Sequence, residues 1–347
     1  MKPNQKVKLV LRNKSVPQQS MAYRAAAELL ARRDNFLIIT HKRPDGDTIG
    51  SAAALCRFLR GLGKTAFIYN NREITPKYFP LVAGLIALSP DYAPDTIITV
   101  DTASLAMLPT GATVYREDID IVIDHHESNT RYGKYCLIEN KAACGEIIYE
   151  LIAAFSNEGF RLPPDIAEAI YVAISTDTGC FSYSNTTGDS LFAASRCAAS
   201  GISLERINKI LFRTTSRARA LVESDMMRGI KFYENGRAAI AIISASIQET
   251  TGATADDMEN IAAVASSIEG VDIAYTITEI SGDECKVSVR TNGAVSANSA
   301  AKLFGGGGHR GAAGFVRKGS GKQVRRDIEN RLSLVFESEI KTADTQL

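Results

Sequence analysis

The stretch FLIITHKRPDGD, residues 36–47, decides how this chain folds. Its first part, FLIIT (36–40), is a short continuous apolar run, which is typical of a strand buried on both faces of a parallel sheet. The run stops at HKRPDGD (41–47), and the alanine- and leucine-rich segment from about 48 to 62 predicts a helix that ends before Gly63. A buried strand joined to a helix by a polar loop is the repeating unit of α/β proteins.

The same unit recurs over the first part of the chain. A helix is predicted at 20–33, before FLIIT, and two more follow at 142–155 and 164–175. Further predicted strands are KTAFIY (64–69), DTIITV (95–100) and IDIVI (119–123). Because strands alternate with helices, we predict a domain over residues 20–205 that is built on a parallel sheet with helices on both faces.

The composition changes near residue 200. Segment 206–231 holds seven Lys or Arg residues against two acidic ones, a net charge of +5 in a chain whose total is +1. We predict a helical connector here, either with a solvated basic face or lining a groove that attracts a polyanion. A second, smaller α/β domain is predicted over 232–340. Its predicted strands are 238–244, 272–280 and 285–291, and its predicted helices are 254–267, 295–304 and 322–338.

Composition narrows the class of protein. With 347 residues and 45% apolar side chains, the chain has enough material for about two folded domains, so disorder of the whole chain is excluded. The near-neutral net charge excludes a polycationic nucleic-acid coat. None of the six cysteines forms a C-x-x-C pair, which argues against a thiolate zinc site and favours reduced, buried thiols. No apolar stretch approaches the ~18 residues of a membrane span, so we expect a cytoplasmic protein without membrane contact.

Acidic and histidine side chains stand where the predicted strands end. Because parallel strands all point the same way, the loops that follow them share one edge of the sheet, where ligands of open α/β sheets bind. An aspartate at the end of the helical run ISTDTG (174–179) joins this group. The converging residues are His41, Asp45, Asp47, Asp101, Asp124, His125, His126 and Asp177.

So many carboxylates cannot lie together without counterions, because like charges at close range raise each other's pKa strongly. Divalent cations remove this conflict, and oxygen and imidazole ligands without thiolate suit Mn²⁺ or Mg²⁺ better than structural Zn²⁺. Two cations ~3.5–4 Å apart would form a clamp for in-line displacement at phosphorus. A single aspartate at such a position is more often a helix cap, but the set taken together predicts a metal centre.

Five motifs in order give a resemblance to a known family. HKRPDGDTIGS, VDTAS, IDHHESN and STDTGCFSYSNTT resemble the four successive motifs of the DHH phosphoesterases. GGGGHRGAAGF resembles the signature of the DHH-associated domain that accompanies them. The resemblance covers roughly residues 20–340 and implies an N-terminal parallel-sheet DHH domain followed by a smaller α/β DHH-associated domain.

The resemblance also implies roles for the converging residues. One cation would take His41, Asp45 and Asp101, and the other would take Asp47, Asp101, His125 and Asp177. Two Mn²⁺ ions are expected, with Mg²⁺ as the alternative, and a water activated between them would be the nucleophile. The catalytic residues would be Asp101 as the bridge, His126 as a phosphate contact, and Asp124 as the support of a histidine or, equally, as a structural cap.

The glycine run at 305–308 has two interpretations. It is either a flexible turn or a loop whose backbone N–H groups approach an anion. The resemblance favours substrate binding, because in similar proteins this domain grips the nucleotide; Asn298 and Ser299 could be helix caps or contacts. The predicted substrate-binding residues are Arg290, Gly306, Gly307, Gly308, His309 and Arg310.

The resemblance leads to a functional hypothesis. A chain of this length fits the nanoRNase and pAp-phosphatase branch, which hydrolyses very short oligoribonucleotides to 5′-mononucleotides or dephosphorylates 3′-phosphoadenosine 5′-phosphate (pAp). The alternatives are a soluble cyclic-di-AMP or pApA phosphodiesterase, an inorganic pyrophosphatase, and a nucleotide sensor without catalysis. Phe181 and Tyr183, beside Asp177, either stack on a base or belong to the core. A homodimer is expected by analogy.

Overall fold

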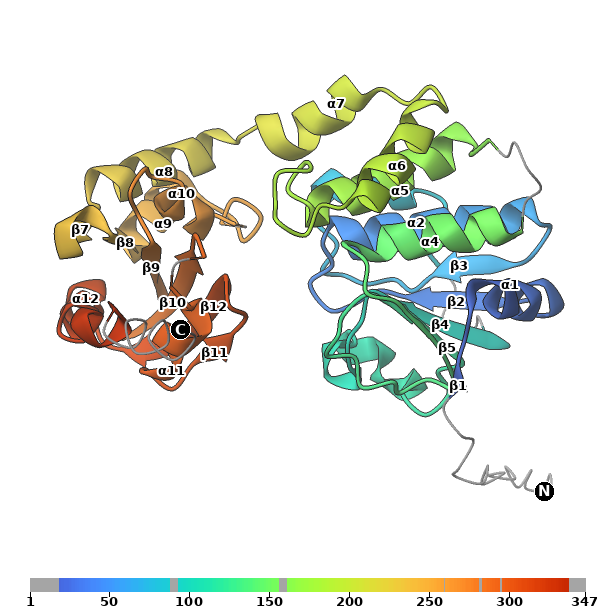
Figure 1. Ribbon diagram of the computed structural model, residues 1–347, viewed down its shortest axis with the longest axis horizontal. Helices are drawn as coiled ribbons and strands as arrows, with labels where there is room; N and C mark the ends of the chain where they lie inside the picture. Colours follow the sequence, from blue (N-terminus) through green and yellow to red (C-terminus); the bar gives the residue numbers. More distant parts are fainter. Residues whose placement is uncertain are drawn as a thin grey trace, which may run out of the picture. The chain divides into compact units, whose positions relative to one another are not determined.

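The computed structural model describes residues 19–87, 93–155, 161–258, 260–280, 283–293 and 295–336. The chain divides between Thr214 and Thr215 into two compact units. The first holds the blue-to-green part of Figure 1 together with the yellow helix α7 (Leu204–Asn208), and the second holds the rest of the chain, to red. Within the described residues, no helix is long and apolar enough to cross a membrane.

The first unit is built on a six-stranded sheet in which every pair of neighbouring strands is parallel, as predicted. Its order is β1-β6-β5-β4-β2-β3. The strands are β1 (Gln19–Ser20), β2 (Phe36–Ile39), β3 (Ala66–Ile68), β4 (Thr96–Val100), β5 (Ile121–Asp124) and β6 (Tyr135–Ile138). Ile38 pairs with Ile98, and Ile98 pairs with Ile121, so the carboxyl ends of the three central strands are level. The sequence analysis missed β1 and β6, since YCLI is short and lies between loops.

The two faces of this sheet are covered differently. One face packs against α-helices in a large apolar core that includes Ile38, Val100 and Ile123 (Figure 1). The opposite face, with Leu37 and Ile97, packs under the 3₁₀ helices η2 (Leu105–Met107) and η3 (Thr110–Tyr115). The prediction of helices on both faces therefore needs this correction, because Pro109 and Gly111 interrupt a longer helix there. The α-helices of the unit are α1 (Tyr23–Arg32), α2 (Gly46–Gly61), α3 (Phe79–Val82), α4 (Cys144–Ala154), α5 (Pro164–Asp177), α6 (Gly188–Ala198) and α7 (Leu204–Asn208).

The basic segment 206–231 is divided between the two units. Its first part lies in α7 and the π-helix η4 (Lys209–Arg213) of the first unit, where Ile207 joins the apolar core. Its second part forms α8 (Arg217–Arg228), whose Val222 and Met226 are buried in the second unit. Each half is thus held by the apolar core of its own unit.

The second unit contains a mixed six-stranded sheet in the order β11-β12-β10-β9-β8-β7. Only β8 and β9 are parallel; the other neighbours are antiparallel. The strands are β7 (Lys231–Tyr233), β8 (Ala238–Ile243), β9 (Ile273–Ile280), β10 (Glu284–Thr291), β11 (Gly307–Gly308) and β12 (Ala312–Lys318). The remaining helices are α9 (Ala245–Thr251), α10 (Ala262–Ser266), α11 (Ala297–Lys302) and α12 (Gly321–Glu329).

One predicted helix of the second unit is wrong in its limits. Instead of a single helix over 254–267, the structure has α9 before this segment and α10 at its end. Gly252 ends α9 in the left-handed conformation, with φ of +66°. Thr254 and Asp257 then form a hydrogen-bonded turn, because the Asp257 carboxylate accepts from the Thr254 backbone N–H at 2.8 Å. Local turn chemistry therefore overrides the helical pattern here.

Candidate metal centre

The ends of three neighbouring strands deliver most of the predicted ligands. His41 follows β2, Asp101 follows β4 directly, and Asp124 is the last residue of β5, before His125 and His126. Because these strands are parallel and level, their following loops meet at one edge of the sheet. The convergence that the sequence predicted is therefore present.

The first turn of α2 supplies two more carboxylates. Asp45 caps this helix, since its Oδ1 accepts hydrogen bonds from the backbone N–H groups of Asp47 (3.1 Å) and Thr48 (3.2 Å). Asp47 is fully buried, and its two oxygens accept from Ser51 Oγ at 3.0 Å and from the backbone N–H groups of Cys144 (2.6 Å) and Gly145 (2.9 Å). Asp47 thus also fixes the start of α4 against α2.

Asp177 comes from the end of a helix rather than from a strand. Helix α5 reaches the edge of the site because glycines let it pack closely against its neighbours. A Cβ atom on Gly50 of α2 would lie 2.4 Å from the Ala169 carbonyl oxygen, and one on Gly145 of α4 would lie 2.5 Å from Ala173 Cβ. Larger residues at these two positions would force α5, and Asp177 with it, away from the sheet.

Asp101 lies between the two groups of proposed ligands. Its Oδ2 is 3.6 Å from His41 Nε2, and its Oδ1 is 3.3 Å from His125 Nε2. His125 Nε2 is in turn 3.4 Å from Asp177 Oδ2 and 3.8 Å from Asp47 Oδ2. Asp101 is 2% exposed, and its Oδ1 has ion-pair contacts with the rings of His125 and His126 but no well-aligned hydrogen bond. Its backbone is also held in the left-handed region, with φ of +52°.

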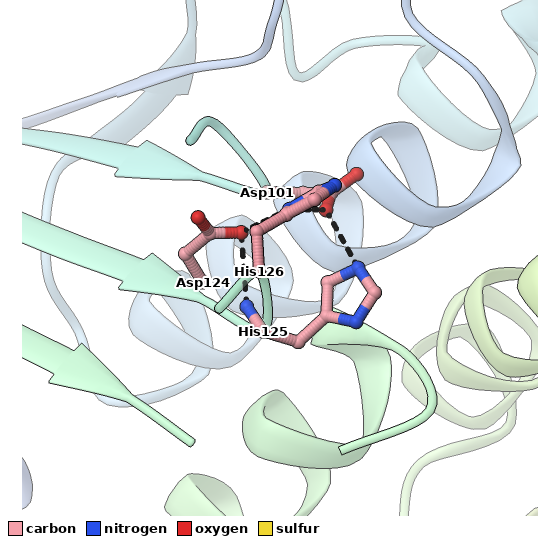
Figure 2. A group of neighbouring side chains, drawn as sticks. All are labelled: Asp101, Asp124, His125 and His126. Carbon is pink, nitrogen blue, oxygen red and sulfur yellow. Dashed lines mark hydrogen bonds and ion pairs between the residues drawn. The ribbon is translucent and has the colours of Figure 1, made fainter. Parts of the chain in front are cut away.

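Asp124 and His126 form a hydrogen-bonded pair at the side of this group (Figure 2). Asp124 Oδ1 is 2.8 Å from His126 Nδ1 and also accepts the backbone N–H of His125 at 2.9 Å. Asp124 has no exposed surface, whereas the His126 ring is partly exposed. An imidazole held at Nδ1 by a carboxylate presents Nε2 to a ligand, which is the arrangement that tunes histidines in metal sites.

No role was predicted for the two asparagines that hold these residues in place. Asn129 Nδ2 donates to Asp124 Oδ2 (2.5 Å) and to the Thr102 carbonyl (3.2 Å). Asn185 Nδ2 donates to the backbone carbonyls of Asp177 (3.1 Å) and Ala142 (3.2 Å). The available signal was their place inside the motifs IDHHESN and STDTGCFSYSNTT, where an amide offers two donors to loops that have unpaired carbonyls.

One further contact orients His125. Its Nδ1 lies 3.1 Å from the Lys141 carbonyl oxygen, so that Nε2 faces the carboxylates. The Lys141 ammonium pairs with Asp189 at 2.6 Å, at the start of α6. The loop that carries this carbonyl is therefore tied to α6 by Lys141 and to α5 by Asn185.

The electrostatics show that the group is unfavourable without a cation. Burial, followed by the charges of Asp101 and Asp45, raises the pKa of Asp177 to about 7. Burial and the charge of Asp101 also hold the pKa of Asp47 well above its usual range. Burial lowers the pKa of His125, but the contact with Asp101 and the charge of Asp47 outweigh it and raise that pKa to about 11. Crowded carboxylates that retain protons, beside a histidine that gains one, are what a bound cation would relieve.

The donor set fits divalent metal ions. Among the described residues, three groups place their possible ligand atoms within 4.8 Å of one another. They are His41, Asp45 and Asp101; Asp47, His125 and Asp177; and Asp101, Asp124, His125 and His126. Asp101 Oδ1, which has ion-pair contacts but no well-aligned hydrogen bond, is free to take a cation. Carboxylate oxygen and imidazole nitrogen suit Mn²⁺ or Mg²⁺, and all six cysteines are free thiols outside these groups, five of them buried as predicted.

The predicted substrate-binding residues belong to the second unit. Gly307 and Gly308 form β11, which pairs with β12, so this stretch is not a flexible turn. The His309 backbone N–H donates to the Ala312 carbonyl at 2.8 Å, and its side chain is exposed. Arg310 is exposed and donates to the Gly293 carbonyl at 3.2 Å. Arg290, near the end of β10, is half-buried.

Asn298 and Ser299, which were predicted to be either helix caps or substrate contacts, both have contacts within the second unit. Ser296, rather than Ser299, caps α11, since its Oγ accepts the Ser299 N–H at 3.2 Å. Asn298 Oδ1 accepts the Gly308 N–H at 3.2 Å, so it supports the glycine loop. The glycine loop is therefore braced by α11 on one side and by β12 on the other.

Comparison with known proteins shows the family to which the chain belongs. The family model "DHH family, N-terminal domain" matches residues 35–174, and that of the DHHA1 domain matches 236–335. The chain is 30% identical to the bifunctional oligoribonuclease and PAP phosphatase NrnA of Thermus thermophilus, over 88% of this chain and 92% of that protein. It is 28% identical to the Bacillus subtilis protein of the same name, over 81% and 88%. The crystal structure of an exopolyphosphatase-related protein from Bacteroides fragilis matches with a TM-score of 0.77 at 23% identity, over 93% of this chain and 99% of that one, which confirms the fold. The chain belongs to the DHH family and carries a DHHA1 domain.

Proposed function

We propose that the protein is a two-metal phosphoesterase that hydrolyses short oligoribonucleotides to 5′-mononucleotides, removes a phosphate from pAp, or does both. The observation that carries this proposal is the position of Asp101, whose two oxygens face two separate sets of histidine and carboxylate ligands. The names of the two related proteins from Thermus thermophilus and Bacillus subtilis support the choice of substrates.

The proposed cofactor is a pair of Mn²⁺ ions, with Mg²⁺ as the alternative. His41, Asp45 and Asp101 would hold one ion, and Asp47, Asp101, His125 and Asp177 would hold the other. When bound, two such cations lower the pKa of water and neutralise charge that develops on the phosphoryl oxygens. The chain contributes fixed ligands whose orientation is set by hydrogen bonds: His125 Nδ1 donates to the Lys141 carbonyl oxygen, and Ser51 Oγ donates to Asp47.

His126 is proposed to contact the scissile phosphate. Hydrogen bonding to Asp124 is the largest cause that raises the pKa of His126, so the imidazolium form is favoured. A cationic donor that is positioned before the reaction stabilises the negative charge of the transition state without reorganisation. Asp124 acts through His126, and Asn129 holds Asp124 in place.

The second unit is proposed to grip the nucleotide through Arg290, His309, Arg310 and the backbone of Gly306, Gly307 and Gly308. The exposed side chains of His309 and Arg310 and the braced glycine loop support this role. Guanidinium groups bind phosphate in a fork geometry, and backbone N–H groups of a glycine loop suit an anion. The homodimer and the cytoplasmic location stay predictions.

A side-by-side hydrolysis panel tests the proposal. The purified chain with Mn²⁺ should release mononucleotides from di- to pentaribonucleotides, or phosphate from pAp, faster than it cleaves cyclic-di-AMP or pyrophosphate. Faster turnover of cyclic-di-AMP or pApA than of the other substrates would favour the cyclic-dinucleotide alternative, and faster turnover of pyrophosphate would favour the pyrophosphatase. Binding of pAp without turnover of any substrate would identify a sensor.

A further inference from the structure

Tyr183 and Phe181, two aromatic residues after Asp177, occupy different environments. Phe181 is partly buried against the apolar core, and its ring centroid lies 5.8 Å from that of Tyr171. Tyr183 is 57% exposed, although it is one of the larger apolar side chains of the unit. Among the described residues, no other aromatic ring packs on Tyr183. Phe181 therefore serves the core, and Tyr183 needs another explanation.

The exposed ring is nevertheless held in one place. Tyr183 lies against the backbone of Gly179, so closely that a Cβ atom at Gly179 would be 2.4 Å from ring atoms Cε1 and Cζ. Its backbone is fixed as well, because the Tyr183 N–H donates to the Thr178 carbonyl at 3.0 Å and the Tyr183 carbonyl accepts from Thr186. The contact with Gly179 and these backbone hydrogen bonds restrict the ring more than an unpacked surface tyrosine would be restricted.

The chain reaches this arrangement through an unusual turn. Gly179, Cys180 and Phe181 are consecutive residues with φ of +54°, +55° and +64°. Left-handed conformations are unfavourable for Cys and Phe, so the fold must hold them there against their preference. The turn starts directly after Asp177 and Thr178, and it brings the ring against Gly179. Gly179 is two residues from Asp177, so their Cα atoms are within roughly 8 Å of each other.

We propose that the exposed face of Tyr183 is a stacking platform for a nucleobase of the substrate, beside the metal centre. The inference rests on the proposed function, and it names the part of the substrate that the first unit would recognise. An aromatic ring that is rigid before binding gains stacking without losing entropy, and it accepts every base because each has a π-face. Such a platform would tolerate different sequences, as a consumer of short RNA fragments requires.

The test compares Tyr183→Leu, which removes the ring, with Tyr183→Phe, which keeps it. The probes are pApA and two analogues of pApA, each with an abasic ribose in place of one adenosine. Binding is measured by calorimetry on metal-free protein, and turnover is measured with Mn²⁺. We expect Tyr183→Leu to raise both Kd and KM for pApA about 5- to 150-fold with a smaller change in kcat, and Tyr183→Phe to retain wild-type values.

The abasic analogues identify the base. On the analogue that lacks the stacked base, Tyr183→Leu should equal the wild type, while on the other analogue it should show the full loss. An equal loss on all three probes, no loss on any, or a Tyr183→Phe variant as weak as Tyr183→Leu would overturn the proposal. Circular dichroism and Mn²⁺ affinity should match the wild type, which separates stacking from damage to the fold. Absence of turnover by the wild type would instead contradict the proposed function, and the calorimetric comparison would still decide the role of Tyr183.

Discussion

The strand-end loops of the first unit and the glycine loop of the second both carry dense motifs, but the fold uses them in opposite ways. In the first unit, Asp47 and Asp177 are carboxyl groups whose charged forms are disfavoured by burial and by the nearby Asp101, which burdens the metal-free fold. In the second unit, Gly306 and Gly308 are required by the fold itself. A Cβ atom on Gly306 would lie 2.3 Å from the Gly314 carbonyl oxygen, and one on Gly308 would lie 2.6 Å from that of Ala312.

Residues of one motif can therefore be needed for different reasons, some for the fold and some for a bound ligand. The crowding of the aspartates is relieved only by a cation, although Asp45 and Asp47 also have local roles at the helix starts, whereas most of the glycine run is explained by the fold alone. Gly307 is the exception, because a Cβ atom there would meet only Asn298 Oδ1, at 3.7 Å. This position, unlike its neighbours, is left for a substrate to explain.

The largest expected effect is on turnover, when the buried carboxylate of Asp101 is changed. Asp101→Asn should reduce turnover roughly 10³-fold or more, because a ligand shared by two cations would be lost. Asparagine tolerates the left-handed backbone of this position, so the fold should survive. In EDTA the variant should be at least as stable as the wild type, since one buried charge is removed. Steady-state kinetics and thermal unfolding check both expectations; near-normal turnover would contradict the two-metal mechanism.

A smaller effect is expected when the ligands stay but their support is removed. Asn185→Ala deletes both donors that link the Asp177 and Ala142 carbonyls. Loss of an outer partner of this kind costs about 10- to 100-fold in metal affinity or activity. Calorimetric titration with Mn²⁺ measures the affinity, and Asn208→Ala, whose contact with Tyr171 lies elsewhere in the unit, is the matched control. Unchanged Mn²⁺ affinity in Asn185→Ala would show that the two loops are held by other contacts.

Two variants of the glycine loop separate its role in the fold from a role in substrate binding. Gly306→Ala should destabilise the fold by about 1–3 kcal/mol, because backbone and Phe315 lie too close to move aside cheaply. Gly307→Ala should change the free energy of unfolding by less than about 0.5 kcal/mol, yet raise KM if the loop meets the substrate. Denaturant unfolding and kinetics on pAp distinguish the two. A Gly307→Ala variant with unaltered KM would remove the substrate from the explanation of this loop.

A further expected effect concerns pH. Asp177 has an ordinary pKa of 3.8 that is raised to about 7 in the folded state, so the metal-free fold binds an extra proton between these values. His125 has an ordinary pKa of 6.5 that is raised to about 11, which extends the same trend to higher pH. In EDTA the free energy of unfolding should therefore fall as the pH rises from 5 to 8. Each kcal/mol that is lost should lower Tm by about 2–4 °C.

Two controls accompany the pH measurement. Asp177→Asn removes the carboxyl group that titrates, so its loss of stability between pH 5 and 7 should be smaller than that of the wild type. Saturating Mn²⁺ should reverse the slope, because metal binding displaces protons and strengthens as the pH rises. A wild-type Tm that increases with pH in EDTA would contradict the interpretation of the buried carboxylates as a burden.

The strand-end part of the site could be predicted from the sequence, because it follows from a simple rule. Apolar runs such as FLIIT ended at His41 and Asp101, and parallel topology alone brought these ends together. Asp177 came from its motif, since its position depends on close helix packing at Gly50 and Gly145, which no local pattern reports. Strand β6 and the roles of Asn129 and Asn185 could not be predicted for a similar reason. The strand is short, the asparagines are single residues, and their functions depend on tertiary partners.

The close packing of α5 has a further consequence for how the protein matures. Asp177, the last of the proposed ligands along the chain, reaches the others only when α5 is packed on α2 and α4, so the complete proposed set requires this helix. Binding of the cations would then be a late event in the folding of the first unit, and it would indicate that this unit is complete. With the proposed site, newly made chains that retain Mn²⁺ would be those whose first unit has finished folding.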